Sequence, residues 1–367
     1  MKRFGWWLLA MSGCSLITPL DELSAPTEAG ADAAVEASCS TDLQADPANC
    51  GTCGHSCQGG TCSGGMCAPI VIASGQANAN AIAVGGGYVY WTEYGAGSVM
   101  RCPVSGCGTN AQVVAQVSGS YTMGLAIDTT TAYFSAKQAS NVTLGTVYAV
   151  PLDGSAAPTP IASNLDHPVW LTIDQANVYW TNWGDGRVMY CPRGNCGTPK
   201  VIYTQGGGPY QGPNGIASTG TAVYWVSDDG NARFCPLTSC ATPTTFATGQ
   251  LGPTGITVDA TSTYWANQGA NDVMKCLLSG CGNNPSLVAS NEPGAYGIAV
   301  DSSGIYWTDG AGGLVRTCPL TGCQKGAVTL ASKLTQPANI ALTPDAVYVA
   351  VYGTASATDG AVIKIPK

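Results

Sequence analysis

Short apolar runs recur along most of the chain at a nearly constant interval. Each run contains two adjacent large residues, and successive copies are 40 to 46 residues apart, at Tyr90-Trp91, Tyr133-Phe134, Tyr179-Trp180, Tyr224-Trp225, Tyr264-Trp265, Tyr306-Trp307 and Tyr348-Val349. A period of this length, built on strand-like phrases, is typical of a β-propeller in which each repeat forms one blade. The pattern therefore predicts an all-β propeller.

Each repeat contains four apolar runs, which we interpret as the four strands of one blade. The first ends in Asp, as in residues 298–301, and the second contains the Tyr-Trp phrase. The third resembles residues 99–103, and the fourth is a short run such as 329–331. β-branched and aromatic residues favour strands, and the Gly, Pro and Asn residues between the runs favour turns.

The two ends of the repeat region complement each other. The first recognisable run, residues 70–73, is of the fourth type, whereas the last repeat, residues 338–367, has only the first three. The N-terminal strand can therefore complete the last blade and close the ring without an unpaired edge. We predict a seven-bladed β-propeller over residues 69–367, closed in this way.

One family resemblance rests on the phrase around the second strand. Residues 306–309 read YWTD, and residues 90–93 and 179–182 read YWTE and YWTN. These phrases resemble the YWTD repeat of propellers of the low-density-lipoprotein-receptor type. That family has six blades, whereas the repeats counted in this chain predict seven.

Composition and charge narrow the class of protein. The chain has 367 residues, of which 48 are Gly and only 10% are charged, which is typical of a loop-rich all-β protein. The formal net charge of −8 argues against nucleic acid as a partner. No apolar run approaches the roughly 20 residues that a membrane-spanning helix needs.

The N-terminus resembles a bacterial lipoprotein signal. Lys2 and Arg3 precede the apolar residues 6–11, and Cys14 follows two small residues. The resemblance implies that residues 1–13 are a signal peptide and that Cys14 carries a lipid; an ordinary secretory signal is the alternative. Residues 14–38 contain several acidic residues and no Lys or Arg, so we expect a disordered tether. The expected location is the bacterial cell envelope, on an outer-membrane lipid anchor, or outside the cell.

Residues 39–67 are too short for a hydrophobic core and rich in cysteine, which predicts a disulfide-rich knot. The segment contains Cys39, Cys50, Cys53, Cys57, Cys62 and Cys67, which allow fifteen pairings. A zinc site using the spacing of Cys50 and Cys53 is the alternative. The segment resembles the cysteine-rich repeat of the stigma-specific secreted protein family, which provides no catalytic residue to carry over.

The propeller repeats contain a second set of cysteines, always two at a time. Five repeats have a Cys-x4-Cys pair next to the third strand: Cys102 and Cys107, Cys191 and Cys196, Cys235 and Cys240, Cys276 and Cys281, and Cys318 and Cys323. The second repeat has Val150 and Ser155 at these positions, so both cysteines are lost together. This predicts a disulfide within each hairpin, and an oxidising compartment.

Few residues suggest catalysis. The chain has only two histidines, His55 and His167, and has no phosphate-binding loop, HExxH sequence or nucleophile elbow. The Asp residues that end the first strands recur too regularly for an active site, and we interpret them as turn residues: Asp128, Asp174, Asp259 and Asp301. We expect no cofactor and no metal ion, and an enzymatic role is the less favoured reading.

The loops at one end of a propeller usually form its binding face, because they place variable side chains on a rigid scaffold. Trp170 stands where most other repeats have Gly, so we expect its ring near the mouth of the channel. The candidate ligand-binding residues in these loops are Tyr94, Tyr121, His167, Trp170, Trp183, Asp185, Asn214, Asp228, Asp229, Tyr296 and Asp309. An aromatic and acidic face suits a sugar, a cationic peptide or a protein surface.

These features lead to three hypotheses about function. The first is a monomeric binding protein of the cell envelope or cell surface, with a protein or a glycan on the loop face. The second is a propeller lyase or hydrolase with a site at the channel mouth. The third is a structural scaffold in an envelope complex.

Overall fold

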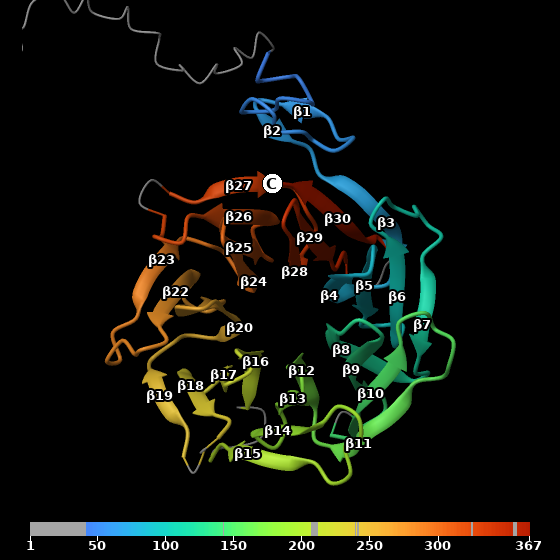
Figure 1. Ribbon diagram of the computed structural model, residues 1–367, viewed down its shortest axis with the longest axis vertical. Helices are drawn as coiled ribbons and strands as arrows, with labels where there is room; N and C mark the ends of the chain where they lie inside the picture. Colours follow the sequence, from blue (N-terminus) through green and yellow to red (C-terminus); the bar gives the residue numbers. More distant parts are fainter. Residues whose placement is uncertain are drawn as a thin grey trace, which may run out of the picture. The chain divides into compact units, whose positions relative to one another are not determined.

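The computed structural model describes residues 42–141, 143–206, 212–238, 240, 242–323, 326–354 and 358–367. In this part of the chain, seven four-stranded antiparallel sheets are arranged in a ring, and a two-stranded sheet lies in the cysteine-rich segment (Figure 1). The prediction of a seven-bladed all-β propeller is confirmed. The described residues form no helix, and hence none that could cross a membrane.

Each blade except the last takes its strands from consecutive residues. Blade 1 consists of β4 (Ala79–Gly85), β5 (Tyr88–Glu93), β6 (Ser98–Pro103) and β7 (Gln112–Gln116). Blade 2 consists of β8 (Ser120–Ile127), β9 (Thr131–Gln138), β10 (Gly145–Pro151) and β11 (Thr159–Leu165). Blade 3 consists of β12 (Pro168–Ile173), β13 (Asn177–Asn182), β14 (Arg187–Pro192) and β15 (Lys200–Thr204). Blade 4 consists of β16 (Pro213–Ser218), β17 (Ala222–Ser227), β18 (Asn231–Pro236) and β19 (Thr244–Ala247). Blade 5 consists of β20 (Pro253–Val258), β21 (Ser262–Asn267), β22 (Asp272–Leu277) and β23 (Ser286–Ser290). Blade 6 consists of β24 (Ala295–Asp301), β25 (Gly304–Asp309), β26 (Leu314–Cys318) and β27 (Val328–Ala331).

The last blade joins the two ends of the repeat region. It consists of β28 (Pro337–Thr343), β29 (Ala346–Val351) and β30 (Gly360–Pro366), with β3 (Ile70–Gln76) as its outer strand. β3 pairs antiparallel with β30, from Ile70 opposite Lys364 to Gln76 opposite Gly360. The predicted closure by the N-terminal strand is therefore confirmed.

The Tyr-Trp phrases form the packing between blades. Trp91, Trp180, Trp225, Trp265 and Trp307 are all completely buried. Trp91 of blade 1, for example, shares a cluster with Tyr348 of blade 7. The repeated phrase is thus core, and it leaves the loops to provide any binding surface.

The inner strands approach so closely that most of them require Gly. A Cβ on Gly215 would collide with the carbonyl oxygen of Thr254 in the next blade, and one on Gly297 would collide with that of Ala338. At the corresponding position blade 3 has Trp170, on a first strand whose pairing with β13 has the same irregularity as in the other blades. Blade 3 therefore places a large ring where four other blades have Gly and blades 1 and 7 have Ala81 and Asn339.

The Cys-x4-Cys pairs of the propeller form the five predicted disulfides. The bonds join Cys102 to Cys107, Cys191 to Cys196, Cys235 to Cys240, Cys276 to Cys281, and Cys318 to Cys323. In each pair the first cysteine is buried on the third strand, whereas the second is only partly buried and lies beyond the turn that follows. Blade 2 has buried Val150 and Leu152 in this region instead of a bridge. Each disulfide therefore fastens a turn to the strand before it, within a single blade.

The cysteine-rich segment is also held by disulfides. It contains the short strands β1 (Cys62–Ser63) and β2 (Met66–Cys67). Its bonds join Cys50 to Cys62 and Cys57 to Cys67. With its sulfur in a disulfide, Cys50 is not available as a zinc ligand.

The Asp residues that end the first strands have the expected role in turns. Asp259 accepts hydrogen bonds from the backbone N–H groups of Thr261 and Ser262, both at 2.7 Å, and from the hydroxyl of Tyr264 at 2.9 Å. Asp128, Asp174 and Asp301 accept equivalent backbone bonds. In two blades the same carboxylate also forms an ion pair with the next blade: Arg193 with Asp128, and Lys367 with Asp301.

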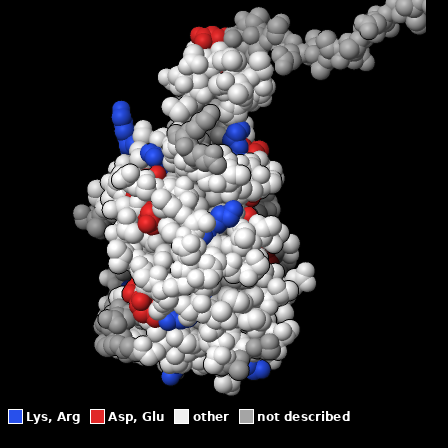
Figure 2. Space-filling view, turned by 90° about the vertical axis from the view of Figure 1, so that its left-hand side faces the viewer, with Lys and Arg blue, Asp and Glu red and all other residues white. Residues whose placement is uncertain are grey.

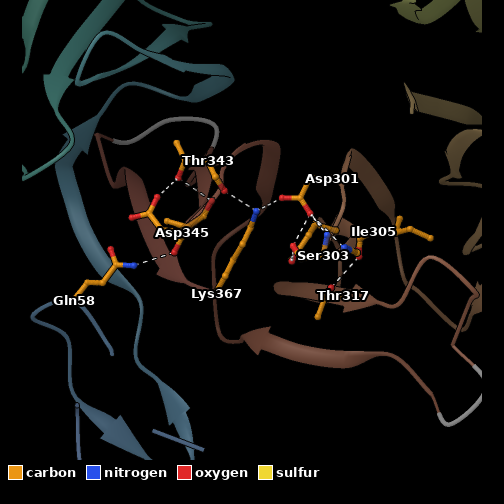
Figure 3. A network of polar contacts seen from close by, with 11 residues as sticks. Gln58, Asp301, Ser303, Ile305, Thr317, Thr343, Asp345 and Lys367 are labelled. Atoms are coloured by element: carbon orange, nitrogen blue, oxygen red, sulfur yellow. Dashed lines mark hydrogen bonds and ion pairs between the residues drawn. The ribbon is translucent and has the colours of Figure 1, made fainter. Parts of the chain in front are cut away.

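The ion pair between Lys367 and Asp301 belongs to a network of polar contacts in blades 6 and 7, near the end of the closing blade (Figure 3). The Lys367 ammonium also donates to the carbonyl of Thr343 at 2.7 Å. Nearby, the side-chain amide of Gln58, from the cysteine-rich segment, donates to the carbonyl of Asp345 at 2.9 Å. This contact links the cysteine-rich segment to blade 7, which carries the closing strand.

Four predictions concern residues outside the described part of the chain. They are the signal peptide over 1–13, the lipid on Cys14, the tether over 14–38, and the pairing of Cys39. They stay predictions.

On the face shown in Figure 2, charged side chains are scattered and form no large patch, as the low charge content leads one to expect.

Candidate binding site at the channel mouth

The loops entering the first strand and the loops joining the second and third strands meet at one end of the ring. In blade 1, for example, Ala79 at the start of β4 pairs with Glu93 at the end of β5. At this end lies a cavity of about 390 Å³, which we call the channel mouth. Its lining comprises Asn80, Tyr94, Met123, Gln268, Tyr296, Gly310, Ala311, Gln336, Pro337, Ala338 and Tyr352. Three phenol rings and three amides thus line it, without any carboxylate, ammonium or guanidinium group.

Trp170 contacts Tyr296 beside the channel mouth. The two rings come from blades 3 and 6 and meet edge to face, with centroids 6.1 Å apart. The indole N–H of Trp170 donates to Oδ1 of Asn214 at 2.8 Å, which holds the ring in place. Tyr296 also lines a second cavity of about 70 Å³, which Trp170 lines with it, and so forms part of the wall between the two cavities. Trp170 therefore reaches the channel, as its place in the repeat predicts.

One side of the channel mouth is built by stacked tyrosines around a buried cation. The rings of Tyr94 and Tyr121 are 4.7 Å apart and nearly parallel, and Tyr352 lies 6.3 Å from Tyr94. The Lys137 ammonium lies 5.7 Å from the Tyr94 centroid and 6.0 Å from the Tyr121 centroid. A cation over the face of a phenol ring is attracted by its quadrupole, so Lys137 holds the two rings together.

Lys137 also contacts His167, with 2.6 Å between Nζ and Nε2. Both side chains are buried. Burial, and then the nearby charge of Lys137, lower the pKa of His167 to about 4, and burial lowers the pKa of Lys137. At neutral pH the imidazole is therefore neutral, and its Nε2 accepts a hydrogen bond from the ammonium group. Lys137 was not among the sequence candidates; the signal was a Lys in the otherwise uncharged run of residues 131–138.

The aromatic surface continues through His167 and Trp183 of blade 3 and ends at Asp228 of blade 4. The His167 and Trp183 rings are 5.0 Å apart and meet edge to face, and the Trp183 N–H donates to Oδ2 of Asp228 at 2.5 Å. Burial raises the pKa of Asp228, and the bond from Trp183 partly offsets this. Eight of the candidates thus lie in two groups of residues that contact one another within the group. The first group, which Lys137 links together, contains Tyr94, Tyr121, His167, Trp183 and Asp228. The second contains Trp170, Asn214 and Tyr296.

The three other candidates have different environments. Asp185 forms an ion pair with Arg187 at 3.3 Å, and Asp229 forms one with Arg233 at 2.5 Å. Asp309 is completely buried and lies behind the wall of the channel mouth, beside Glu292. The arginines that pair with Asp185 and Asp229 lie close to them in sequence, whereas the burial of Asp309 beside Glu292 depends on a separate loop and could not be predicted from the sequence.

No family model and no curated protein matches this chain. Solved structures with a similar fold include virginiamycin B lyase from Staphylococcus aureus (12% identity, TM-score 0.64, covering 79% of this chain and 95% of that one). Others are a chain of a nidogen/laminin complex (18%, 0.54, 69% and 97%) and the WD40 propeller of Doa1 (14%, 0.61, 82% and 96%). At such low identities the likeness shows the fold alone. The chain is thus similar in fold to YWTD-type, WD40 and lyase propellers, and these similarities do not assign its ligand.

Proposed function

We propose that this protein binds a glycan, with one neutral sugar residue in the channel mouth. The observation that carries the proposal is the lining of that cavity, which combines the rings of Tyr94, Tyr296 and Tyr352 with the amides of Asn80, Gln268 and Gln336. A sugar ring has apolar C–H faces that pack on aromatic rings, and its hydroxyl groups pair with amides, which both donate and accept. A volume of about 390 Å³ is within the range of small-molecule sites.

The charge of the lining favours a neutral ligand over an ionic one. A cationic peptide would lack an anionic partner in the cavity, and a phosphorylated or carboxylated ligand would lack a cationic one. Lys137 does not change this, because its ammonium is buried behind Tyr94 and Tyr121. We further propose that binding takes place in the cell envelope or outside the cell, supported by the many disulfides and by the N-terminal sequence.

A glycan array probed with the oxidised protein tests the proposal. Tyr352→Ala should reduce binding at least tenfold, because it removes one aromatic wall. Tyr88→Ala is the matched control, since Tyr88 is partly buried but does not line the channel mouth. A blank array would overturn the proposal, and a specific protein partner recovered from envelope extracts would then favour the protein-ligand alternative.

The second candidate function is a lyase or hydrolase, and one observation favours it. Lys137 and His167 form a buried pair beside the aromatic surface, and such a pair can move a proton. A similar propeller, virginiamycin B lyase with quinupristin, was solved as a catalytically inactive histidine-to-alanine variant. Turnover of a carbohydrate or lactone that His167→Ala abolishes, without loss of binding, would favour this candidate.

A further inference from the structure

Two carboxyl side chains are buried directly behind the wall of the channel mouth, in blade 6. Glu292 is 1% exposed and Asp309 is completely buried. Asp309 immediately precedes Gly310 and Ala311, which line the mouth, and Glu292 lies in the loop that leads to Tyr296. The two loops are bonded to each other, through Gly310 N–H to Gly294 O at 3.0 Å and Gly312 N–H to Pro293 O at 3.2 Å.

The two carboxyl groups differ in how their oxygens are paired. Glu292 accepts from the indole N–H of Trp307 at 3.0 Å and from the Arg316 guanidinium at 3.3 Å. Within the described residues, neither oxygen of Asp309 has a hydrogen bond of normal geometry, although the Trp307 N–H, which donates to Glu292, lies near enough to lower the pKa of Asp309. Two ionised carboxylates side by side repel each other because they carry like charges, and they cannot form a hydrogen bond to each other because both only accept. A proton on Asp309 would turn one of its oxygens into a donor to Glu292.

Blade 5 has the same arrangement built from amides. Gln250 precedes Trp265 by 15 residues, as Glu292 precedes Trp307, and Asn267 takes the place of Asp309. Two donors converge on one acceptor there: the Trp265 indole N–H and the Asn267 amide both donate to Oε1 of Gln250 at 2.9 Å. A protonated Asp309 can make the bond to Glu292 that Asn267 makes to Gln250. The acid pair therefore reproduces the amide pair only while it holds a proton.

The charged groups that act on Asp309 are Glu292, on the loop before β24, and Arg316, on β26. Burial, followed by the contact with Glu292, raises the pKa of Asp309 to about 8, and Arg316 opposes this. Asp309 is thus mainly protonated at neutral pH.

We propose that Glu292 and Asp309 form a proton-dependent switch that orders the wall of the channel mouth, so that the mouth is assembled at neutral pH and loosens at alkaline pH. Loss of the proton leaves two buried anions and a single guanidinium, that of Arg316, which is paired with Glu292, and the loops over 291–294 and 310–313 separate to admit water. Tyr296, Gly310 and Ala311 then lose their fixed positions. The effect on ligand binding rests on the proposed function, whereas the ordering of the loops does not.

Amide hydrogen exchange between pH 6 and pH 9, corrected for intrinsic exchange rates, tests the switch. Protection of segments 291–296 and 309–314 should fall up to about tenfold between pH 7 and pH 9, because one pH unit above its pKa only about a tenth of a group stays protonated. In Asp309→Asn, which copies blade 5, protection should not depend on pH. Unchanged protection in the wild type, or the wild-type profile in Asp309→Asn, would overturn the proposal.

Blade 5 offers a matched control. Its segments 250–255 and 266–271 should show no pH dependence in the wild type, and a double variant with Gln250→Glu and Asn267→Asp should acquire one. Calcium chloride at pH 9 separates a proton switch from a cation site: restored protection of 309–314 would overturn the proposal in favour of a cation site.

The glycan array at pH 6 and pH 9 separates the switch from the proposed function. Binding at pH 6 that is lost at pH 9 in the wild type but retained in Asp309→Asn supports both. A blank array with pH-dependent exchange overturns the proposed function and supports the switch. Equal binding at both pH values in the wild type overturns the link between them.

Discussion

The closure of the ring by β3 leads to a quantitative prediction for Ile72→Ala. Ile72 is 1% exposed and packs in the cluster that joins blade 7 to blade 1, with Trp91, Tyr348 and Val362 among its members. The substitution removes three carbon groups, at about 0.8 kcal/mol each, and leaves a cavity at a seam between rigid sheets. We therefore expect a loss of about 3–4 kcal/mol in the free energy of unfolding.

Urea denaturation of the oxidised protein, followed by tryptophan fluorescence, measures this loss. Val71→Ala is the matched control, because Val71 is adjacent in the same strand but 55% exposed, and it should cost less than about 0.5 kcal/mol. A loss for Ile72→Ala no greater than that for Val71→Ala would refute the reasoning. It would mean that β3 separates from β30 before the ring unfolds, and that the seam adds nothing to the cooperative transition.

Three further predictions concern other contacts. A double variant with Cys102→Ser and Cys107→Ser should fold, as blade 2 does without a bridge, and lose about 2 kcal/mol in urea denaturation because the closed loop is short. Arg193→Leu should lose under about 1 kcal/mol, since Leu237 occupies the equivalent turn of blade 4. Burial raises the pKa of Asp128, but hydrogen bonds from Thr130 and Thr131 and the charge of Arg193 outweigh this and hold the pKa below its usual value. The stability lost in Arg193→Leu should therefore be measurable above about pH 4 and disappear in more acidic solution, where Asp128 is protonated. Folded Asp309 keeps a proton that the unfolded chain releases, whereas folded His167 lacks a proton that the unfolded chain holds up to about pH 6.5, and the two effects oppose each other below that pH. Wild-type stability should therefore fall by about 1.4 kcal/mol per pH unit as pH rises from about 6.5 toward 8, and Asp309→Asn should remove this slope in denaturation curves measured across that range.

The fold could be predicted because its determinants are local and repeated. Each strand carries its own apolar pattern, and seven copies reinforce the assignment of any single one. The site was harder to predict, because its contacts join residues from different blades. Lys137 meets His167 across 30 positions of sequence, and the environment of Asp309 depends on Glu292 and Arg316 in other elements. A YWTD phrase gives no sign that its last carboxyl group lies beside a second one.

The Trp170–Tyr296 contact lies where the channel mouth gives way to a second cavity of only about 70 Å³. If the proposed glycan binds here, so narrow a continuation favours the end of a chain or a side branch over the middle of a long polymer. On that proposal, the occupancy of the channel mouth would rise when a long glycan is cut into short pieces of equal total mass, because cutting creates chain ends. Fragmentation of the ligand would thus be visible to this protein even where the amount of ligand stays constant.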